Sequence, residues 1–235
     1  GLGHSALSNN TTGSHNVGLG TNALTKNTTG NYNVGIGNST LTNNAAGMGN
    51  VAIGNLSLVS NNGGNYNVAV GNEALGANTS GAYNIALGTS ALANNTTGQH
   101  NNAQGLNALQ NNIVGSNNIA LGNGSGGWVK GHNNIHIGSA NFQSVSTGEL
   151  DNVIAIGNGI GSSALTTANS NDNTIILGYQ NGHAFSPNVG IGTYKPDSKV
   201  HIVTNGPNAI KIQDTNQGAG KVLTSDANGV GTWKE

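Results

Sequence analysis

Short apolar segments recur along the chain in one alternating pattern. The pentapeptide Asn-Val-Ala-Ile-Gly at 50–54 returns with small changes at 16–20, 33–37, 67–71, 84–88 and 118–122. Its closing glycine falls at 3, 20, 37, 54, 71, 88, 105 and 122, which is a period of 17 residues. A fixed short period is typical of repeat proteins whose units stack on one another. The sequence therefore predicts a solenoid with one coil for every 17 residues.

Each coil is predicted to hold a short strand, a glycine turn and a second extended piece. In the coil 67–83, Val68 and Val70 share one face of the strand because side chains alternate. Gly71 permits a turn that a residue with a Cβ resists. The Ala-Leu pair that follows begins the second extended piece, and the Asn, Thr, Ser and Gly residues after it have turn chemistry.

Aliphatic residues of successive coils fall into three columns. Stacked at about 4.8 Å, the spacing of strands in a sheet, they form continuous ladders. We expect all three columns to point into the solenoid: Leu7, Leu24, Leu41, Leu58, Leu75, Leu92 and Leu109; Val17, Val34, Val51, Val68, Ile85 and Ile119; and Leu19, Ile36, Ile53, Val70, Leu87 and Leu121. At Asn102 and Gln104 the strand columns become polar, and an inward Gln104 would need a hydrogen bond. The predicted fold class is all-β, a parallel β-solenoid or β-roll of 17-residue coils.

In the coils up to residue 122, the strand position between the two aliphatic columns is small. It reads Gly18, Gly35, Ala52, Ala69, Ala86, Ala103 and Ala120. A solvent-facing position in so polar a chain should carry Thr, Ser, Asn or Lys. We interpret this column as an outward face that another chain approaches closely, which favours a homo-oligomer. The alternative is that glycine and alanine merely suit tight coils.

An asparagine precedes almost every strand, at positions 16, 33, 50, 67, 84, 101 and 118. Such regularity indicates a structural role rather than a ligand site. We expect either a stacked asparagine ladder or asparagines in left-handed turn positions.

Composition limits the possible functions. Charged residues make up 6% of the 235 residues, against about 25% in typical soluble domains, and the net charge is −1. The chain has no cluster of Lys and Arg to bind nucleic acid and no apolar run approaching the roughly 20 residues of a membrane span. It has no Cys and therefore no disulfides. Because it starts inside a repeat without Met, we expect it to be part of a longer protein.

The pattern at 50–54, together with the Ala-Leu pair that follows such strands, resembles the head repeats of trimeric autotransporter adhesins. The Thr-Thr-Gly turns at 11–13, 28–30 and 96–98 are similar to repeats in tail fibres and tail-fibre-like surface proteins. The resemblance implies a homotrimeric β-roll, located outside the cell on a phage-like particle or a bacterial surface. The period of 17 is longer than the adhesin heads usually use, so the turns must differ.

The end of the chain adds a second resemblance. Residues 188–196 and 220–233 are similar to the stretch that precedes an endosialidase-type intramolecular chaperone in such fibres, although the chaperone domain itself is not present. We expect the solenoid to occupy 1–192, with regular coils to 122 and irregular coils over 123–192. A small β module at 193–235 would then cap the solenoid or hold the trimer together. Its expected strands are 199–203, 209–212 and 221–224.

Aromatic residues provide the candidates for ligand binding. The residue before the strand asparagine reads His15, Tyr32, Gly49, Tyr66, Tyr83, His100 and Asn117, which forms an aromatic stripe along the solenoid. Tyrosine suits sugar or protein contacts because its ring packs on apolar surface while its hydroxyl forms hydrogen bonds. Tyr32, Tyr66 and Tyr83 are therefore candidates, together with Trp128 in the irregular coils. The alternatives are that the rings cover the turn below and that the irregular coils reflect drift near the end of the array.

The sequence offers no catalytic pattern, and we expect no enzyme activity, metal or cofactor. His132 and His136 are spaced as H-x-x-x-H but lack an adjacent acidic ligand, although a trimer could gather histidines on its axis. We predict a structural or adhesive fibre segment that presents or forms a binding surface for a cell-surface glycan or protein. Two alternatives remain: a subunit of an amyloid-like filament, and a polysaccharide-active enzyme on a monomeric β-helix.

Overall fold

The structure, a computed structural model, describes residues 1–142, 150–160, 175–177, 189–191, 200–202, 220–225 and 231–234. The chain divides into two compact units, Gly1–Pro187 and Asn188–Glu235. Strands and turns make up the described residues, and the predicted all-β solenoid is confirmed. The predicted boundary at 192/193 lies outside the described residues.

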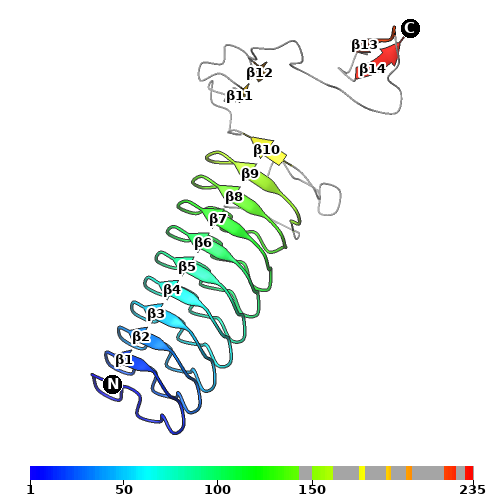
Figure 1. Cartoon of the computed structure of the whole chain (residues 1–235). Coiled ribbons are helices and arrows are strands. Elements are labelled where there is room, and N and C mark those ends of the chain that lie inside the picture. The colour runs from blue at the N-terminus through cyan, green and yellow to red at the C-terminus, as the bar shows by residue number, and fades with distance from the viewer. Residues whose placement is uncertain are drawn as a thin grey trace. The chain divides into compact units, whose positions relative to one another are not determined.

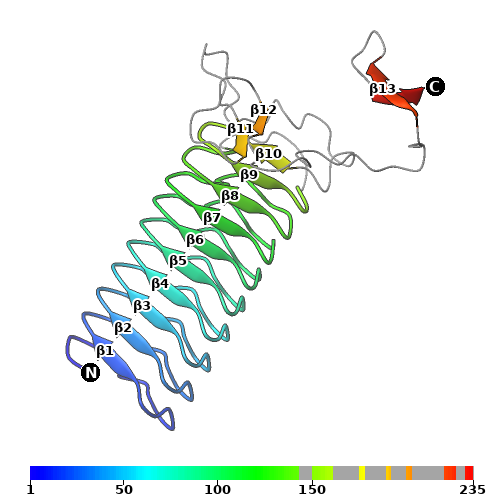
Figure 2. The same cartoon turned by 45° about the horizontal axis from the view of Figure 1, so that its top comes forward.

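The first unit contains one parallel sheet whose ten strands follow chain order (Figure 1). These are β1 (Val17–Leu19), β2 (Val34–Ile36), β3 (Val51–Ile53), β4 (Val68–Val70), β5 (Ile85–Leu87), β6 (Asn102–Gln104), β7 (Ile119–Leu121), β8 (Ile135–Ile137), β9 (Ile154–Ile156) and β10 (Ile175–Leu177). Equivalent residues pair without a register shift, as in Val17↔Val34 and Gly18↔Gly35. Figure 2 shows the coils of β1–β9 stacked side by side along the solenoid.

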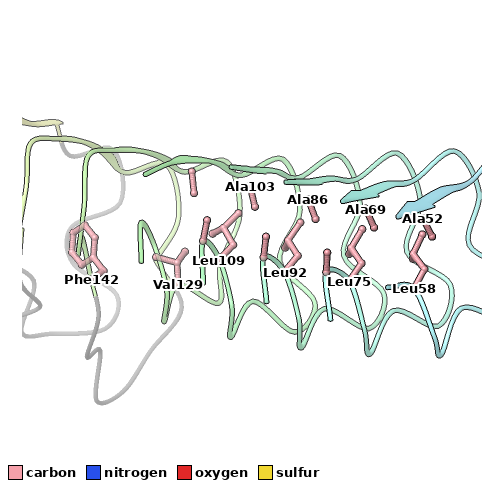
Figure 3. Packing of buried hydrophobic residues seen from close by; sticks show 14 of the residues in the cluster. Ala52, Leu58, Ala69, Leu75, Ala86, Leu92, Ala103, Leu109, Val129 and Phe142 are labelled. Carbon is pink, nitrogen blue, oxygen red and sulfur yellow. The ribbon is translucent and has the colours of Figure 1, made fainter. Parts of the chain in front are cut away.

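The interior of the solenoid is built from the small strand residue and the leucine column, which face each other (Figure 3). Ala52, Ala69 and Ala86 are fully buried, as are Leu58 and Leu75 on the opposite wall. The two other strand positions point away from this interior and retain solvent exposure. The expectation that the small column faces outward and the strand aliphatics face inward is therefore wrong, and the two faces are exchanged.

The thinness of the coil explains this exchange. The leucine side chain already fills the space beneath the strand, so the inward strand residue must be small. A Cβ placed on Gly18 would lie 3.2 Å from Leu7 Cγ, and one on Gly35 would lie 3.4 Å from Leu24 Cγ. A branched inward residue would therefore overlap the leucine column, since well-packed interiors leave little free volume.

The leucine column lies in a turn rather than in the second extended piece that the sequence predicts. Leu24, Leu58 and Leu75 have φ values of 54°, 50° and 52°, in the left-handed region. This conformation is uncommon for a bulky residue. The backbone of the turn is stabilised by the next coil, because Leu24 N donates to the carbonyl oxygen of Thr40 at 2.9 Å.

Buried asparagines form two ladders along the solenoid. In the first, the asparagine before each strand bonds to its equivalent one coil away, so that Asn67 Nδ2 donates to Asn50 Oδ1 at 3.1 Å. In the second, Asn61 Nδ2 donates to Asn44 Oδ1 at 2.7 Å. Of the two alternatives expected for this asparagine, the stacked ladder is the one that the structure shows. The second ladder, at positions 10, 27, 44, 61, 78, 95 and 112, lies in the Asn-, Thr- and Gly-rich stretch that was predicted only as a turn.

The described residues of the second unit form two short strand pairs. β11 (Val189–Ile191) pairs in parallel with β12 (Val200–Ile202), and β13 (Val222–Ser225) pairs antiparallel with β14 (Gly231–Lys234). Two of the expected strands, 199–203 and 221–224, correspond to β12 and β13. The expected strand at 209–212 lies outside the described residues.

Candidate binding surfaces

The outward side of the sheet is an exposed aliphatic surface. We define the outer face as the first and third residues of strands β1–β5 and β7–β9. Its side chains are partly to substantially exposed, with Val17 at 45% and Ile53 at 37%. The face contains no Lys, Arg, Asp or Glu. It is made of Val17, Leu19, Val34, Ile36, Val51, Ile53, Val68, Val70, Ile85, Leu87, Ile119, Leu121, Ile135, Ile137, Ile154 and Ile156.

Strand β6 interrupts the outer face with two amides. Asn102 is half-buried and Gln104 is exposed, and Gln104 Nε2 donates to Asn102 Oδ1 at 3.0 Å. Both side chains point outward, whereas Ala103 between them is fully buried. Gln104 is thus hydrogen-bonded as expected, but on the surface rather than in the interior.

The aromatic stripe consists of stacked rings. His15 stacks on Tyr32 with ring centroids 4.9 Å apart, and Tyr83 stacks between Tyr66 at 5.3 Å and His100 at 5.0 Å. Tyr32 is 64% exposed and Tyr66 is 49% exposed. Because stacked neighbours share their ring faces, Tyr83 offers mainly its ring edge and hydroxyl group to a ligand, whereas Tyr32 and Tyr66 are each stacked on one face. Three of the predicted site residues, Tyr32, Tyr66 and Tyr83, therefore belong to one surface.

Gly49 divides the stripe into two stacks. A Cβ placed on Gly49 would lie 2.6 Å from Tyr66 Cδ1, so the tyrosine ring leans over the glycine. The Tyr66 hydroxyl lies 3.5 Å from the sulfur of Met48. The stripe is therefore a pair and a triplet of rings rather than one continuous ladder.

The fourth predicted site residue, Trp128, lies in a different column. It is 45% exposed, and its backbone N–H donates to the carbonyl oxygen of Phe142 at 3.2 Å. It stands one period after Asn111 and two after Asn94, in a turn and not in the aromatic stripe. The structure therefore does not bring Trp128 together with the tyrosines. Most of the irregular coil turns next to it, at 143–149 and 161–174, lie outside the described residues.

Two shallow hollows lie along the turns on the side of the leucine column. One, of about 300 Å³, is lined by residues that include Leu56, Val59, Glu73 and Ala77. The other, of about 450 Å³, is lined by Lys26, Asn43, Ala45, Ser60, Asn62 and Thr79. Both are lined by turn residues of several successive coils, and no sequence motif marks them.

The two histidines of the H-x-x-x-H spacing occupy different environments. His132 lies in a turn, where its Nδ1 accepts a hydrogen bond from Ser116 N at 3.1 Å. His136 is buried in the interior, and neither ring nitrogen has a hydrogen-bond partner in the described part of the chain. Burial lowers the pKa of His136 to about 4. The two side chains therefore do not form a common ligand pair.

Groups of three or more His, Asp or Glu able to hold a metal ion do not occur among the described residues. These residues also include no helix that is long and apolar enough to span a bilayer. No protein-family model, curated protein or solved structure matches the chain.

Proposed function

We propose that the chain is a rigid segment of a homotrimeric fibre, a tail fibre or surface adhesin that acts outside the cell. The observation that carries this proposal is the outer face, a long aliphatic surface on a solenoid whose own core is complete without it. Soluble monomers rarely expose a large contiguous apolar patch. Such a face favours lateral association of copies over the end-to-end stacking of an amyloid-like filament.

The size of the outer face suits a stable interface. If each side chain of the face exposes about 60 Å², the whole face offers on the order of 1,000 Å², which a trimer divides between two neighbours; the roughly 1,000 Å² then buried in total between each pair of copies meets the lower limit for a specific interface. The absence of charge removes the main cost of burying it. The number of three copies follows from the resemblance of the repeats to autotransporter heads.

Rigidity follows from the hydrogen bonds between coils. Strand, turn and asparagine ladders link each coil to the next, as with Val51 N to the Asn67 carbonyl oxygen at 2.8 Å and Asn84 Nδ2 to Asn67 Oδ1 at 3.1 Å. A stack held at three places around its perimeter resists bending better than a single sheet. This suits a shaft that holds a binding surface away from its base.

The aromatic stripe is the proposed contact surface for a cell-surface glycan or protein receptor. Its tyrosines are exposed, regularly spaced and set in a surface rich in asparagine and glycine. Ring edges and hydroxyls of this kind contact both apolar patches and hydroxyl groups of a partner.

Substitutions on and beside the outer face test the proposal. Ile36→Lys/Ile53→Lys places two charges on the face, and we expect the trimer to dissociate while the circular dichroism spectrum is retained. Asn38→Lys/Asn55→Lys is the matched control, because both asparagines are exposed two residues further along the same coils. If both variants keep the mass of the unsubstituted oligomer, the outer face is not the interface. Deleting residues 51–84 should also shorten the rod by about 10 Å in electron micrographs.

A further inference from the structure

Strand β6 interrupts the outer face without disturbing the coil that carries it. Asn102 and Gln104 pair in register with Ile85 and Leu87 on one side and with Ile119 and Leu121 on the other. The inward residue, Ala103, is as deeply buried as its equivalents in other coils. Nothing inside the solenoid therefore requires polar residues at these two positions. Their function must be sought on the outside of the sheet.

The two amides satisfy each other only in part. The bond from Gln104 Nε2 to Asn102 Oδ1 leaves Asn102 Nδ2 and Gln104 Oε1 without a partner among the described residues. Each copy of the chain thus carries one unused donor group and one unused acceptor at the same height. Exchanging the nitrogen and oxygen of both amides preserves this balance, since one donor and one acceptor still remain.

A surface that covers the outer face must match this polar interruption. A wholly aliphatic partner would bury Asn102 Nδ2 and Gln104 Oε1 unpaired, at a cost of about 1–3 kcal/mol for each group. A second copy of this chain at the same height instead offers its Gln104 Oε1 to Asn102 Nδ2. Every other strand of the face then meets aliphatic side chains. If one copy is displaced by one coil along the other, the amides of each copy lie against an aliphatic strand of its neighbour, β5 in one copy and β7 in the other.

We propose that Asn102 and Gln104 form a polar layer that fixes the register between parallel copies of the chain. This inference rests on the proposed homotrimer and adds to it how the copies are aligned. The donor lies in one outward column and the acceptor in the other, so the contact runs head to tail from copy to copy. A head-to-tail contact closes into a ring when the rotation between successive copies returns to the first copy, as it does in a homotrimer. An antiparallel pair aligned on β6 would leave β1 without an opposing strand of the same sheet.

Distances between spin labels test the alignment. Thr21→Cys and Thr89→Cys place labels at exposed positions directly after β1 and β5, beside the outer face. Parallel copies in register give one short, narrow distance between copies at each site. A long distance at Thr21 combined with a short one at Thr89 would instead show antiparallel copies and overturn the proposal.

The decisive variant is Asn102→Ile/Gln104→Leu, which gives β6 the outward residues of β7. We expect its mass to remain that of the trimer, while the label distances broaden as copies shift by multiples of about 4.8 Å, the spacing of strands. Adding Val68→Asn/Val70→Gln moves the polar layer to β4 and should restore one narrow distance. This rescue separates a register function from a general effect of polarity.

The failures of the two proposals are distinguishable. If the Asn102→Ile/Gln104→Leu variant keeps one narrow distance, the register inference fails and the trimer stands. If the unsubstituted chain has the mass of one copy and gives no distance between labels, the trimer itself fails. A single narrow distance that broadens in the variant and returns with the relocated layer supports both.

Discussion

His136 occupies the space that Gly126 leaves in the interior of the solenoid. A Cβ placed on Gly126 would lie 3.1 Å from His136 Cδ2 and 3.1 Å from Leu109 Cδ2. Gly126 stands one period after Leu109, where other coils carry leucine, and His136 stands where neighbouring strands carry alanine. The Phe142 ring closes the site at a centroid distance of 5.1 Å from the imidazole. The missing leucine and the added histidine therefore compensate each other in volume.

This exchange of volume predicts strong coupling between the two positions. Gly126→Leu alone should overlap the imidazole, and His136→Ala alone should leave a cavity, each at about 1–3 kcal/mol. The double variant restores the pattern of the other coils, and Leu109 shows that leucine adopts the required positive φ. We expect it to be more stable than either single variant in urea denaturation. Additive effects of the two substitutions would contradict the compensation.

Buried His136 also predicts a loss of stability in acid. Neutral imidazole is favoured in the folded chain because burial lowers its pKa to about 4, below the 6.5 of the unfolded chain. The unfolded state therefore binds more protons as pH falls below 6.5, and stability decreases until about pH 4. The total loss in the free energy of unfolding between pH 6.5 and pH 4 is about 3 kcal/mol. The surrounding Leu109, Gly126 and Phe142 offer no charge to offset it.

The same double variant is the control for the pH effect. Gly126→Leu/His136→Ala retains every other titratable group, so the difference between its urea midpoint and that of the unsubstituted chain isolates His136. We expect the difference to grow between pH 6.5 and 4 and to level off above pH 7. A constant difference across this range would show that the imidazole is not buried in the neutral form.

The asparagine ladder should be costly to interrupt. Asn67 Nδ2 donates to the Gly81 carbonyl oxygen at 2.9 Å, and Asn67 Oδ1 accepts from Asn84 N at 3.0 Å. Asn67→Ala leaves several buried groups unpaired, and we expect a loss of about 3 kcal/mol or more in urea denaturation. Asn94→Ala removes an exposed bond, 2.9 Å from Nδ2 to Asn111 Oδ1, and should cost less than about 0.5 kcal/mol. Equal losses of unfolding free energy in the Asn67→Ala and Asn94→Ala variants would mean that burial does not determine the cost of removing an asparagine.

The strand positions and the period could be predicted because they repeat. Alternation and a period of 17 residues place β1–β5 and β7 where the structure has them. Even the polar strand β6 follows from the spacing alone. The asparagine ladder could be foreseen only as one of two possibilities, because a recurring asparagine before the strand also suits a left-handed turn position.

Alternation alone could not tell which strand face is buried. Period-two patterns fix which residues share a face, but the inside is chosen by what lies opposite. Here the leucine column approaches the strand from a turn in which leucine has the left-handed conformation, as at Leu75 with φ of 52°. Neither a helical nor a strand pattern in the sequence predicts such a turn. Gly35 and Ala52 are small because the leucine column packs against them inside the solenoid, and not because a partner chain approaches them. The surface through which we expect copies of the chain to associate is therefore the outer face and not the column of small residues.

The aromatic stripe predicts that hydroxyl groups matter for recognition more than ring stacking does. Tyr32→Phe/Tyr66→Phe/Tyr83→Phe keeps all the stacks while removing three hydroxyls. We expect unchanged thermal stability and at least tenfold weaker binding to those members of a glycan array that the unsubstituted chain binds. Asn55→Ala, at an exposed position outside the stripe, is the control. Retained binding by the triple variant would place the contact elsewhere.

The most direct measurement of the central claim is the mass of the unsubstituted chain in solution. Light scattering on a size-exclusion column distinguishes one copy of 23.4 kDa from an oligomer. Association of three copies through the outer face predicts a mass of about three times 23.4 kDa, independent of salt because the face carries no charge. A stable mass of 23.4 kDa at micromolar concentration would contradict the claim and leave the outer face as the surface of a monomer.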